Sequence, residues 1–419
     1  MDLKYLYDTV ENCPCGYVHS CDIKYVNVSH GAIDSLKTVL GDFSSAVLVA
    51  DINTYAACGD KVKSVISEKI KAELIYRPKG LLIPNEDAVD SLLSVIQKDT
   101  DVIVGVGSGV INDICKYTSN KLGIEYVIVA TAPSMDGYAS KGAAMIWDGM
   151  KETFNAHVPY AIIADTSVLK DAPKDMIIAG YGDIIGKYSA LNDWKLASAV
   201  HNEYFCPKIY GIMMDAVERT VPLANGLMNG SEESVGILME SLVIAGVAMA
   251  FAGNSRPASG SEHHLSHFFE ITGIVKGREY FPHGIDVVYS TYVTALLRES
   301  LLNVKPPFKS KKHNAVQWKQ DIESVYGRVA DGVIALQNKM GRYDSSPIAT
   351  YEQKWDEIRS ILSEHPSAER IKMILDGVGL DLAKFESMYS NDIIYTAIKY
   401  AKDLKDRYTV LWLYNELVG

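Results

Sequence analysis

Short apolar runs alternate with longer amphipathic segments over about the first 170 residues of the chain. Runs of four or five residues rich in Val, Ile and Ala are typical of buried β-strands, and they occupy residues 46–50, 73–76, 101–105, 126–130 and 160–164. Between the second and third runs, residues 86–98 carry apolar side chains at helical spacing after Asn85, a favourable N-cap residue. Strands that alternate with helices predict a mostly parallel, Rossmann-like α/β sheet.

The β pattern fades after residue 170, and the remaining segments have helical periodicity. The predicted helices occupy residues 176–199, 210–227, 231–253, 259–272, 285–302, 318–340, 351–362, 367–375 and 391–417. Turn-forming residues cluster at 164–175, which indicates a domain boundary there. We therefore expect a dinucleotide-binding α/β domain over residues 1–168, followed by an all-helical, metal- and substrate-binding domain over residues 169–419.

Charge and composition narrow the class of protein. The chain carries 41 Lys and Arg against 52 Asp and Glu, a net charge of −11, which argues against a broad surface for nucleic acid or anionic membranes. Its longest uncharged apolar stretch, residues 241–253, is shorter than the roughly 20 residues that span a bilayer, so a buried helix is expected there and no membrane span. The N-terminus lacks the apolar core of a signal peptide, and six cysteines are too few for a disulfide framework, which favours a cytoplasmic location.

A glycine-rich loop follows the third predicted strand. Residues 101–116 read DVIVGVGSGVINDICK, in which Gly107, Ser108 and Gly109 separate the strand from the next helix. Such a loop lets the backbone approach a ligand closely, and the helix N-terminus offers N–H groups to a pyrophosphate. Val110 stands where the dinucleotide fingerprint has its last glycine. A plain glycine turn is the alternative.

Two other strand ends carry polar residues. Asp51 ends the first predicted strand, where an acid accepts hydrogen bonds from a ribose diol and disfavours a 2′-phosphate. Residues 131–134 (TAPS), with Ser140 beyond them, place hydroxyl groups at the end of a fourth strand, where open α/β sheets bind ligands. The alternatives are strand-end capping for Asp51 and a hydroxyl-rich turn for residues 131–140.

Four of the ten histidines lie close together in the sequence: His263, His264, His267 and His283. On a helix, His267 shares a face with either His263 or His264, and His283 follows in a Pro-His-Gly turn. This clustering favours a divalent metal site, although the spacing does not choose between the first two histidines. Asp183, in a Gly-Asp pair at the expected start of a helix, is either the carboxylate ligand or an N-cap.

The N-terminal segment has a second group of metal-binding residue types, Cys13, Cys15, His19 and Cys21. Its spacing differs from that of standard zinc knuckles, and no second cysteine pair follows. The sequence favours a small structural turn here.

Taken in order, these motifs resemble the iron-containing alcohol dehydrogenase and dehydroquinate synthase-like superfamily. Within it, the chain is most similar to the sn-glycerol-1-phosphate dehydrogenases, because residues 255–263 (SRPASGSEH) resemble the signature that separates them from glycerol dehydrogenases. The N-terminal Cys-x-Cys-Gly-x-x-His stretch is similar to that of the bacterial branch. The resemblance covers roughly residues 15–300 and implies the dehydroquinate synthase-like fold.

The resemblance also implies roles for the cofactor and metal residues. A pyrophosphate would lie on Gly107, Ser108, Gly109, Val110 and Ile111, the adenosine ribose on Asp51, and the rest of the cofactor on Thr131, Ala132, Pro133, Ser134 and Ser140. Asp183, His263 and His283 would bind one divalent metal ion, zinc or nickel, which makes His264 a neighbour. Relatives often carry lysine or arginine where this chain has Val110.

For the substrate, the resemblance implies contacts to Asp136, Asp183 and His267, with Asp183 and His267 as the catalytic pair. A phosphorylated substrate also needs cationic donors, and Arg256 and Lys187 are the candidates. Surface salt bridges are the alternative for both.

The resemblance implies NAD(P)-dependent hydride transfer between dihydroxyacetone phosphate and sn-glycerol 1-phosphate. A homodimer is the assembly considered for the enzyme. A glycerol or related polyol dehydrogenase on the same scaffold is the alternative, and a catalytically silent NAD- or metal-binding regulatory protein is a third hypothesis. A dehydroquinate-type synthase is disfavoured, because that branch has glutamate where Asp183 stands.

Overall fold

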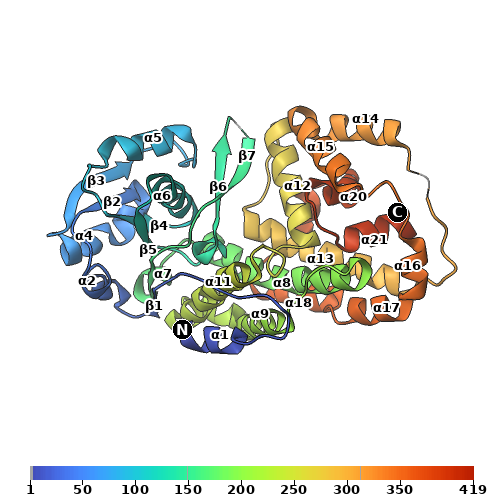
Figure 1. The fold of residues 1–419 in the computed structure, drawn as a ribbon, viewed down its shortest axis with the longest axis horizontal. Helices are drawn as coiled ribbons and strands as arrows, with labels where there is room; N and C mark the ends of the chain where they lie inside the picture. The colour runs from blue at the N-terminus through green and yellow to red at the C-terminus, as the bar shows by residue number, and fades with distance from the viewer. Residues whose placement is uncertain (1–2, 149, 312) are drawn as a thin grey trace. The chain divides into compact units, whose positions relative to one another are not determined.

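The computed structural model describes residues 3–148, 150–311 and 313–419, and these form two compact units (Figure 1). The first unit contains Met1–Ile184 and Glu218–Asn254, and the second contains Ile185–Val217 and Ser255–Gly419. The division differs from the expected boundary at residue 168, since residues beyond it contribute to both units. The reason is that two long helices, α8 (Lys174–His201) and α9 (Pro207–Thr220), each cross the division.

A six-stranded parallel sheet forms the centre of the first unit. Its order is β1 (Tyr25–Ser29), β8 (Ala161–Asp165), β5 (Glu125–Ala130), β4 (Val102–Gly107), β2 (Ala46–Asp51) and β3 (Ile70–Tyr76). All five neighbouring pairs are parallel. Every residue of β4 is buried, as expected of an apolar run in a sheet covered on both faces. The predicted α/β fold with a parallel sheet is confirmed.

The sequence analysis missed three strands. β1 lies at the sheet edge with exposed ends and a polar centre, so its sequence, YVNVS, has no continuous apolar run. The other two form an antiparallel hairpin, β6 (Gly142–Trp147) and β7 (Met150–Asn155). Ala143 and Met145 of β6 pack with Val89 outside the main sheet, in a cluster too small to give a strong periodic pattern.

Helices surround the sheet of the first unit. They are α1 (Leu3–Val10), η1 (Ala32–Ser35), α2 (Leu36–Val39), α3 (Ile52–Thr54), η2 (Tyr55–Gly59), α4 (Asp60–Ile66), α5 (Glu86–Val95), α6 (Gly109–Leu122), η3 (Gly137–Ala139), α7 (Thr166–Leu169), η4 (Val221–Leu223), α10 (Ala224–Met228) and α11 (Glu232–Ala252). By length and composition alone α11 could cross a membrane, but 83% of its apolar window is buried inside the protein. It is the buried helix expected there.

The described residues of the second unit form helices joined by loops, with no strand among them. Besides the parts of α8 and α9 that belong to it, it contains α12 (Ser261–Lys276), α13 (His283–Leu302), α14 (Ala315–Tyr326), η5 (Gly327–Val329), α15 (Ala330–Met340), α16 (Ile348–Gln353), α17 (Trp355–Ser363), α18 (Ala368–Gly377), α19 (Leu382–Met388), α20 (Asn391–Tyr400), η6 (Ala401–Leu404) and α21 (Val410–Leu417). The predicted helix over residues 318–340 is interrupted at Gly327, whose φ of 52° is left-handed. The short α19 was missed.

Candidate active site

The glycine loop joins a fully buried strand of the sheet to a helix N-terminus. β4 ends at Gly107 and α6 begins at Gly109, and the N-cap residue Ser108 makes no capping hydrogen bond with its side chain. A Cβ atom on Gly107 would lie 2.5 Å from the Cβ of Ile111, so a side chain there would force the loop and the helix apart. The first-turn N–H groups of α6 are therefore not capped by Ser108, which suits an anionic ligand.

The glycine loop lies beside the position at which the order of the parallel strands reverses across the sheet. From β2 the chain moves outward to β3 and then returns to β4 on the other side of β2. In open α/β sheets, ligands bind at the carboxyl ends of the strands beside such a reversal. Gly107 ends β4 and Asp51 ends β2, so two of the predicted cofactor residues flank it.

Asp51 also has a local structural role. Its Oδ1 accepts hydrogen bonds from the N–H groups of Asn53 (2.8 Å) and Thr54 (3.0 Å), and its own N–H donates to the Thr54 hydroxyl (3.0 Å). This capping box starts α3, as the capping alternative anticipated. Both of these hydrogen bonds use Oδ1 of the carboxylate, so Oδ2 could still accept a hydrogen bond from a ribose. The predicted contact between Asp51 and the cofactor ribose stays a prediction.

The segment after β5 packs tightly on its neighbours. The Thr131 N–H donates to the Gly107 carbonyl (3.1 Å), which ties this segment to the glycine loop. A Cβ on Gly180 of α8 would lie 1.8 Å from the Pro133 carbonyl oxygen, so only glycine permits this approach. Residues 131–133 are buried, whereas Ser134 is half-buried and is the most accessible predicted cofactor contact of the four.

Ser140 belongs to a network around a buried lysine. The ammonium of Lys116 on α6 donates to the carbonyls of Gly137 (2.8 Å) and Gly142 (3.0 Å) and lies 3.4 Å from the Ser140 hydroxyl. Ser140 itself donates to the Gly137 carbonyl (3.0 Å). Burial lowers the pKa of Lys116 to about 8. These contacts give Ser140 a structural role, and its predicted contact with the cofactor has no separate support.

Three of the four clustered histidines lie side by side. His263 and His267 are one turn apart on α12, and His283 is the first residue of α13. The ring centres are 5.9 Å apart for His263 and His267, 5.1 Å for His263 and His283, and 5.4 Å for His267 and His283. His264 is fully buried, and neither of its ring nitrogens has a hydrogen-bond partner among the described residues. The geometry thus groups His263, not His264, with the other two.

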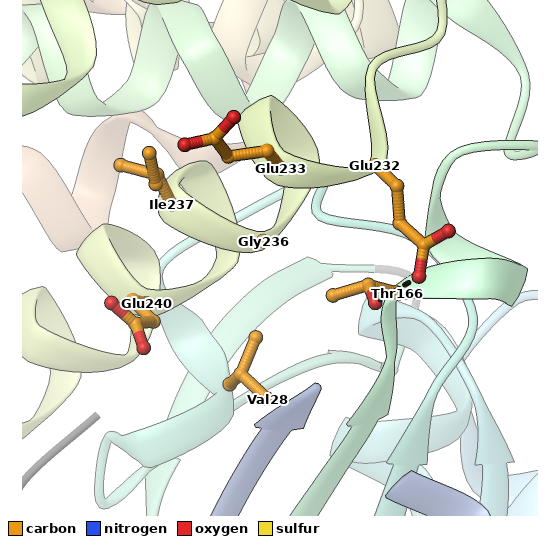
Figure 2. Close-up of a pocket in the computed structure, with 7 residues that line it drawn as sticks. All are labelled: Val28, Thr166, Glu232, Glu233, Gly236, Ile237 and Glu240. Atoms are coloured by element: carbon orange, nitrogen blue, oxygen red, sulfur yellow. Dashed lines mark hydrogen bonds between the residues drawn. The ribbon is translucent and has the colours of Figure 1, made fainter. Parts of the chain in front are cut away.

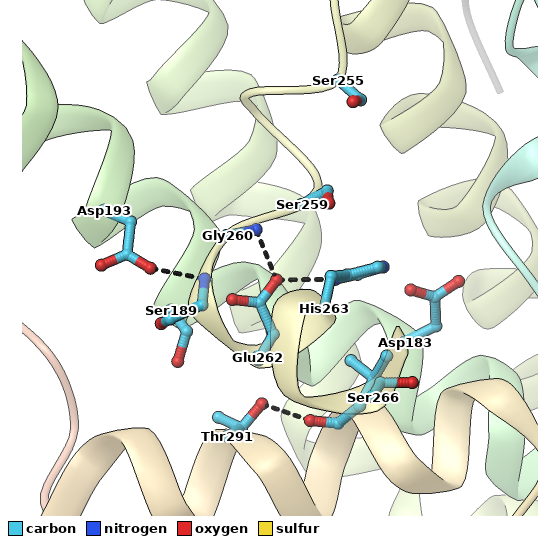
Figure 3. A network of polar contacts seen from close by, with 12 residues as sticks. Asp183, Ser189, Asp193, Ser255, Ser259, Gly260, Glu262, His263, Ser266 and Thr291 are labelled. Atoms are coloured by element: carbon cyan, nitrogen blue, oxygen red, sulfur yellow. Dashed lines mark hydrogen bonds and ion pairs between the residues drawn. The ribbon is translucent and has the colours of Figure 1, made fainter. Parts of the chain in front are cut away.

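Asp183 lies in the interior of α8, which begins nine residues earlier at Lys174. The expectation that it stands at a helix start was wrong. Gly180 and Gly182, which favour a turn in the sequence, lie inside the continuous helix α8. The Asp183 Oδ2 accepts the N–H of Asp136 (3.0 Å). Asp183 belongs to the first unit, whereas His263, drawn with Glu262 in Figure 3, and His283 belong to the second. A carboxylate and two imidazoles form a donor set that suits a divalent transition metal.

Glu262 orients the first of these histidines and was missed by the sequence analysis. Its Oε1 lies 2.7 Å from His263 Nδ1 and accepts the N–H of Gly260 (2.8 Å), as Figure 3 shows. This contact occupies Nδ1 and leaves Nε2 as the ligand atom. Burial, reinforced by the charge of Asp193, raises the pKa of Glu262 to about 8. Burial lowers the pKa of His263 well below 6.5, which favours the neutral imidazole that binds metals.

A buried ion pair fixes the start of α12. Asp193 accepts hydrogen bonds from the Ser261 N–H (2.7 Å), the Arg298 guanidinium (2.8 Å) and the Val410 N–H (2.8 Å). The side chains of Asp193 and Arg298 are 1% and 2% exposed. Because Ser261 is the first residue of α12, this pair positions the helix that carries His263.

The two predicted phosphate contacts have different surroundings. Lys187 is fully buried on α8, and its charge contributes to the lowered pKa of His263. This burial does not fit the surface position that its alternative, a surface salt bridge, requires. Arg256 pairs with Glu203 and donates to the Tyr408 carbonyl (3.0 Å), and its side chain is 12% exposed. An ion pair was the alternative for Arg256, and its contact with substrate stays a prediction.

The first unit also contains a surface pocket away from the predicted site residues (Figure 2). It is lined by Val28, Thr166, Glu232, Glu233, Gly236, Ile237 and Glu240. Thr166 donates to Glu232 across it (2.6 Å). Three carboxylates in its wall disfavour an anionic dinucleotide or phosphate, so the pocket is not a candidate for either ligand.

Comparisons with known proteins identify the family of the chain. A family model described as iron-containing alcohol dehydrogenase matches residues 27–173. The NAD(P)+ glycerol-1-phosphate dehydrogenase of Geobacillus thermodenitrificans is 30% identical over 417 residues, which cover 97% of this chain and 96% of the relative. The enzyme of the same name from Halalkalibacterium halodurans is 29% identical over 422 residues, which cover 99% and 98%.

Among solved structures, the iron-containing alcohol dehydrogenase of Thermococcus thioreducens aligns with a TM-score of 0.62 at 12% identity, covering 95% of this chain and 98% of that one. At this identity the likeness shows a shared fold alone, which is the α/β and helical architecture described above. Since relatives at about 30% identity cover nearly the full length of both chains, the chain belongs to the family of NAD(P)-linked glycerol-1-phosphate dehydrogenases.

Proposed function

We propose that this enzyme interconverts dihydroxyacetone phosphate and sn-glycerol 1-phosphate with NAD(P) as the hydride carrier. The observation that carries the proposal is the group of three adjacent imidazoles, His263, His267 and His283, in a chain whose relatives are named for this reaction. The glycine loop between β4 and α6 supports the cofactor part of the proposal.

Asp183, His263 and His283 would hold one divalent ion, which acts as a Lewis acid on the substrate oxygen when bound. Zinc and nickel both accept imidazole and carboxylate ligands, and we propose either for this site. Glu262 keeps the His263 ring in place through Nδ1. His267, whose ring is 5.4 Å from that of His283, would orient a substrate hydroxyl or move its proton.

For the cofactor, the nicotinamide ring supplies or accepts the hydride. The chain's part is to hold the pyrophosphate on residues 107–111 and the adenosine ribose on Asp51. An acid at the position of Asp51 disfavours a 2′-phosphate, so we propose NAD over NADP. The Asp136 N–H holds the Asp183 carboxylate, which links the segment after β5 to the metal ligand. We propose that the enzyme works in the cytoplasm, and we include a homodimer as a possible assembly.

The decisive experiment measures NADH and NADPH oxidation with dihydroxyacetone phosphate and with unphosphorylated dihydroxyacetone. It uses chelator-treated protein and the same protein after addition of zinc or nickel. We expect activity with the phosphorylated ketone only, restored by metal, and sn-glycerol 1-phosphate by chiral analysis of the product. A faster reaction with dihydroxyacetone would favour the polyol dehydrogenase alternative, and no hydride transfer with any metal would favour the silent protein.

Replacing Arg256 by alanine is expected to raise KM for dihydroxyacetone phosphate by about tenfold with little change in kcat. The reason is that a cation that binds the phosphate group equally strongly in the ground state and the transition state lowers KM and leaves kcat unchanged. Steady-state kinetics measure the effect. Arg342→Ala is the matched control, because Arg342 shares the Glu203 carboxylate at 3.5 Å. If the two variants behave alike, Arg256 has only the structural role of its ion pair.

A further inference from the structure

The N-terminal segment contains a second group of metal-ligating side chains that the proposed reaction does not use. We propose that Cys13, Cys15 and His19 bind a thiophilic divalent cation, with zinc as the ion of first choice. Each residue offers one ligand atom, and these atoms lie within 4.8 Å of one another. The Sγ of Cys15 lies 3.1 Å from Nε2 of His19.

The second nitrogen of His19 is held in the way that metal-binding histidines require. Nδ1 lies 2.8 Å from the carbonyl oxygen of Phe251, near the end of α11. A carbonyl only accepts, so Nδ1 carries the proton and Nε2 presents its lone pair toward Cys15. The Phe251 ring packs beside the imidazole, with ring centres 6.3 Å apart. A histidine fixed at one nitrogen by a carbonyl and directed at a thiol by the other matches the surroundings of a zinc ligand.

The backbone of the segment brings the two cysteines together. Asn12 and Gly16, on either side of them, have left-handed φ values of 55° and 81°, so the chain turns sharply at both ends of the Cys-Pro-Cys stretch. Residues 11–24 contain no helix or strand, and no disulfide involves Cys13 or Cys15. A bound ion would hold this irregular segment by bonds that its own backbone does not provide.

The ligand set differs from the grouping suggested by the sequence. Cys21 is buried and its carbonyl accepts the Tyr7 hydroxyl, so it has a structural role of its own beside Cys13, Cys15 and His19. Thiolates and imidazoles are the donors of structural zinc sites. None of the three residues is among those proposed for hydride transfer, so the ion would stabilise the irregular segment that carries them.

Cobalt substitution separates this site from the Asp183 group in the full-length protein. Metal-stripped protein is titrated with Co²⁺, and absorbance is recorded in the region of thiolate-to-cobalt charge transfer, which a carboxylate and imidazoles do not produce. Because the Asp183 group also takes up cobalt, we expect this band to saturate by two equivalents per chain in the parent protein and at one equivalent in His263→Ala. We also expect it to be lost in Cys15→Ser and His19→Gln and retained in His263→Ala. Zinc content by mass spectrometry should fall by one equivalent in the first two variants.

Cys58→Ser and Cys115→Ser serve as controls, because both cysteines are buried outside the group and should leave the band unchanged. Circular dichroism confirms that each variant is folded. If Cys15→Ser fails to fold, the wild-type band and its loss in His19→Gln still decide the question. Absence of the band in wild-type protein, or its survival in folded Cys15→Ser or His19→Gln, would overturn the proposal whether or not the dehydrogenase activity is found.

Discussion

Replacing His263 with alanine is expected to lower kcat for reduction of dihydroxyacetone phosphate by about 10²–10³-fold, the cost of losing a group that stabilises developing charge on oxygen. The variant should also lose the metal of the Asp183 group, because two ligands remain in place of three. Initial rates under saturating substrate and cofactor, together with metal analysis of the dialysed protein, measure both effects.

His264→Leu is the matched control for this prediction. The two histidines are neighbours in sequence and similarly buried, but the ring nitrogens of His264 have no partner among the described residues, while Nδ1 of His263 contacts Glu262. We expect His264→Leu to keep its metal and most of its activity. Equal losses in both variants would mean that the helix, rather than a ligand, had been disturbed, and the assignment of His263 would fail.

The second large effect concerns stability. Asp193→Ala is expected to lower the free energy of unfolding by about 3–5 kcal/mol, because the Arg298 guanidinium is left buried without its counter-charge. The N–H groups of Ser261 and Val410 lose their acceptor in the same variant. Chemical denaturation of the variant and the parent, with the metal removed from both, measures the difference.

Two further variants test the reason for this loss. Asp193→Asn keeps an acceptor of the same shape without the charge, so we expect a smaller loss than with alanine. Asp376→Ala breaks the exposed pair of Lys372 and Asp376, which should contribute less than about 1 kcal/mol. If Asp193→Ala costs no more than Asp376→Ala, the buried network does not hold α12 as described.

The sequence predicted the elements that are marked by their own residues, such as a continuous apolar run or a glycine-rich loop. The runs that became β2, β4, β5 and β8 are apolar and bounded by turn residues, so burial on both faces was readable from them. The glycine loop was equally clear, because close approach of backbone and helix excludes side chains. β1 gave no such signal, since an edge strand with a polar centre is stabilised by its pairing with β8 and not by its own pattern.

The candidate site was predicted in its residue types and only partly in its geometry. Helical spacing placed His267 on a face shared with either His263 or His264, and the fold resolves this choice by burying His264 apart from the group. Glu262 was missed because an acidic residue in a first helical turn is ordinary, and only the folded chain shows its contact with Nδ1.

The sequence by itself determined the parallel α/β sheet, the helical remainder, the glycine loop and the histidine cluster, because each depends on side-chain chemistry and spacing within some twenty residues. The tertiary structure decided the rest: that α8 and α9 cross the division between units, that Arg256 pairs with Glu203, and that Cys21 lies outside the group of Cys13, Cys15 and His19. These depend on contacts between segments far apart in the chain, and packing of distant surfaces leaves no periodic trace in the sequence of either segment.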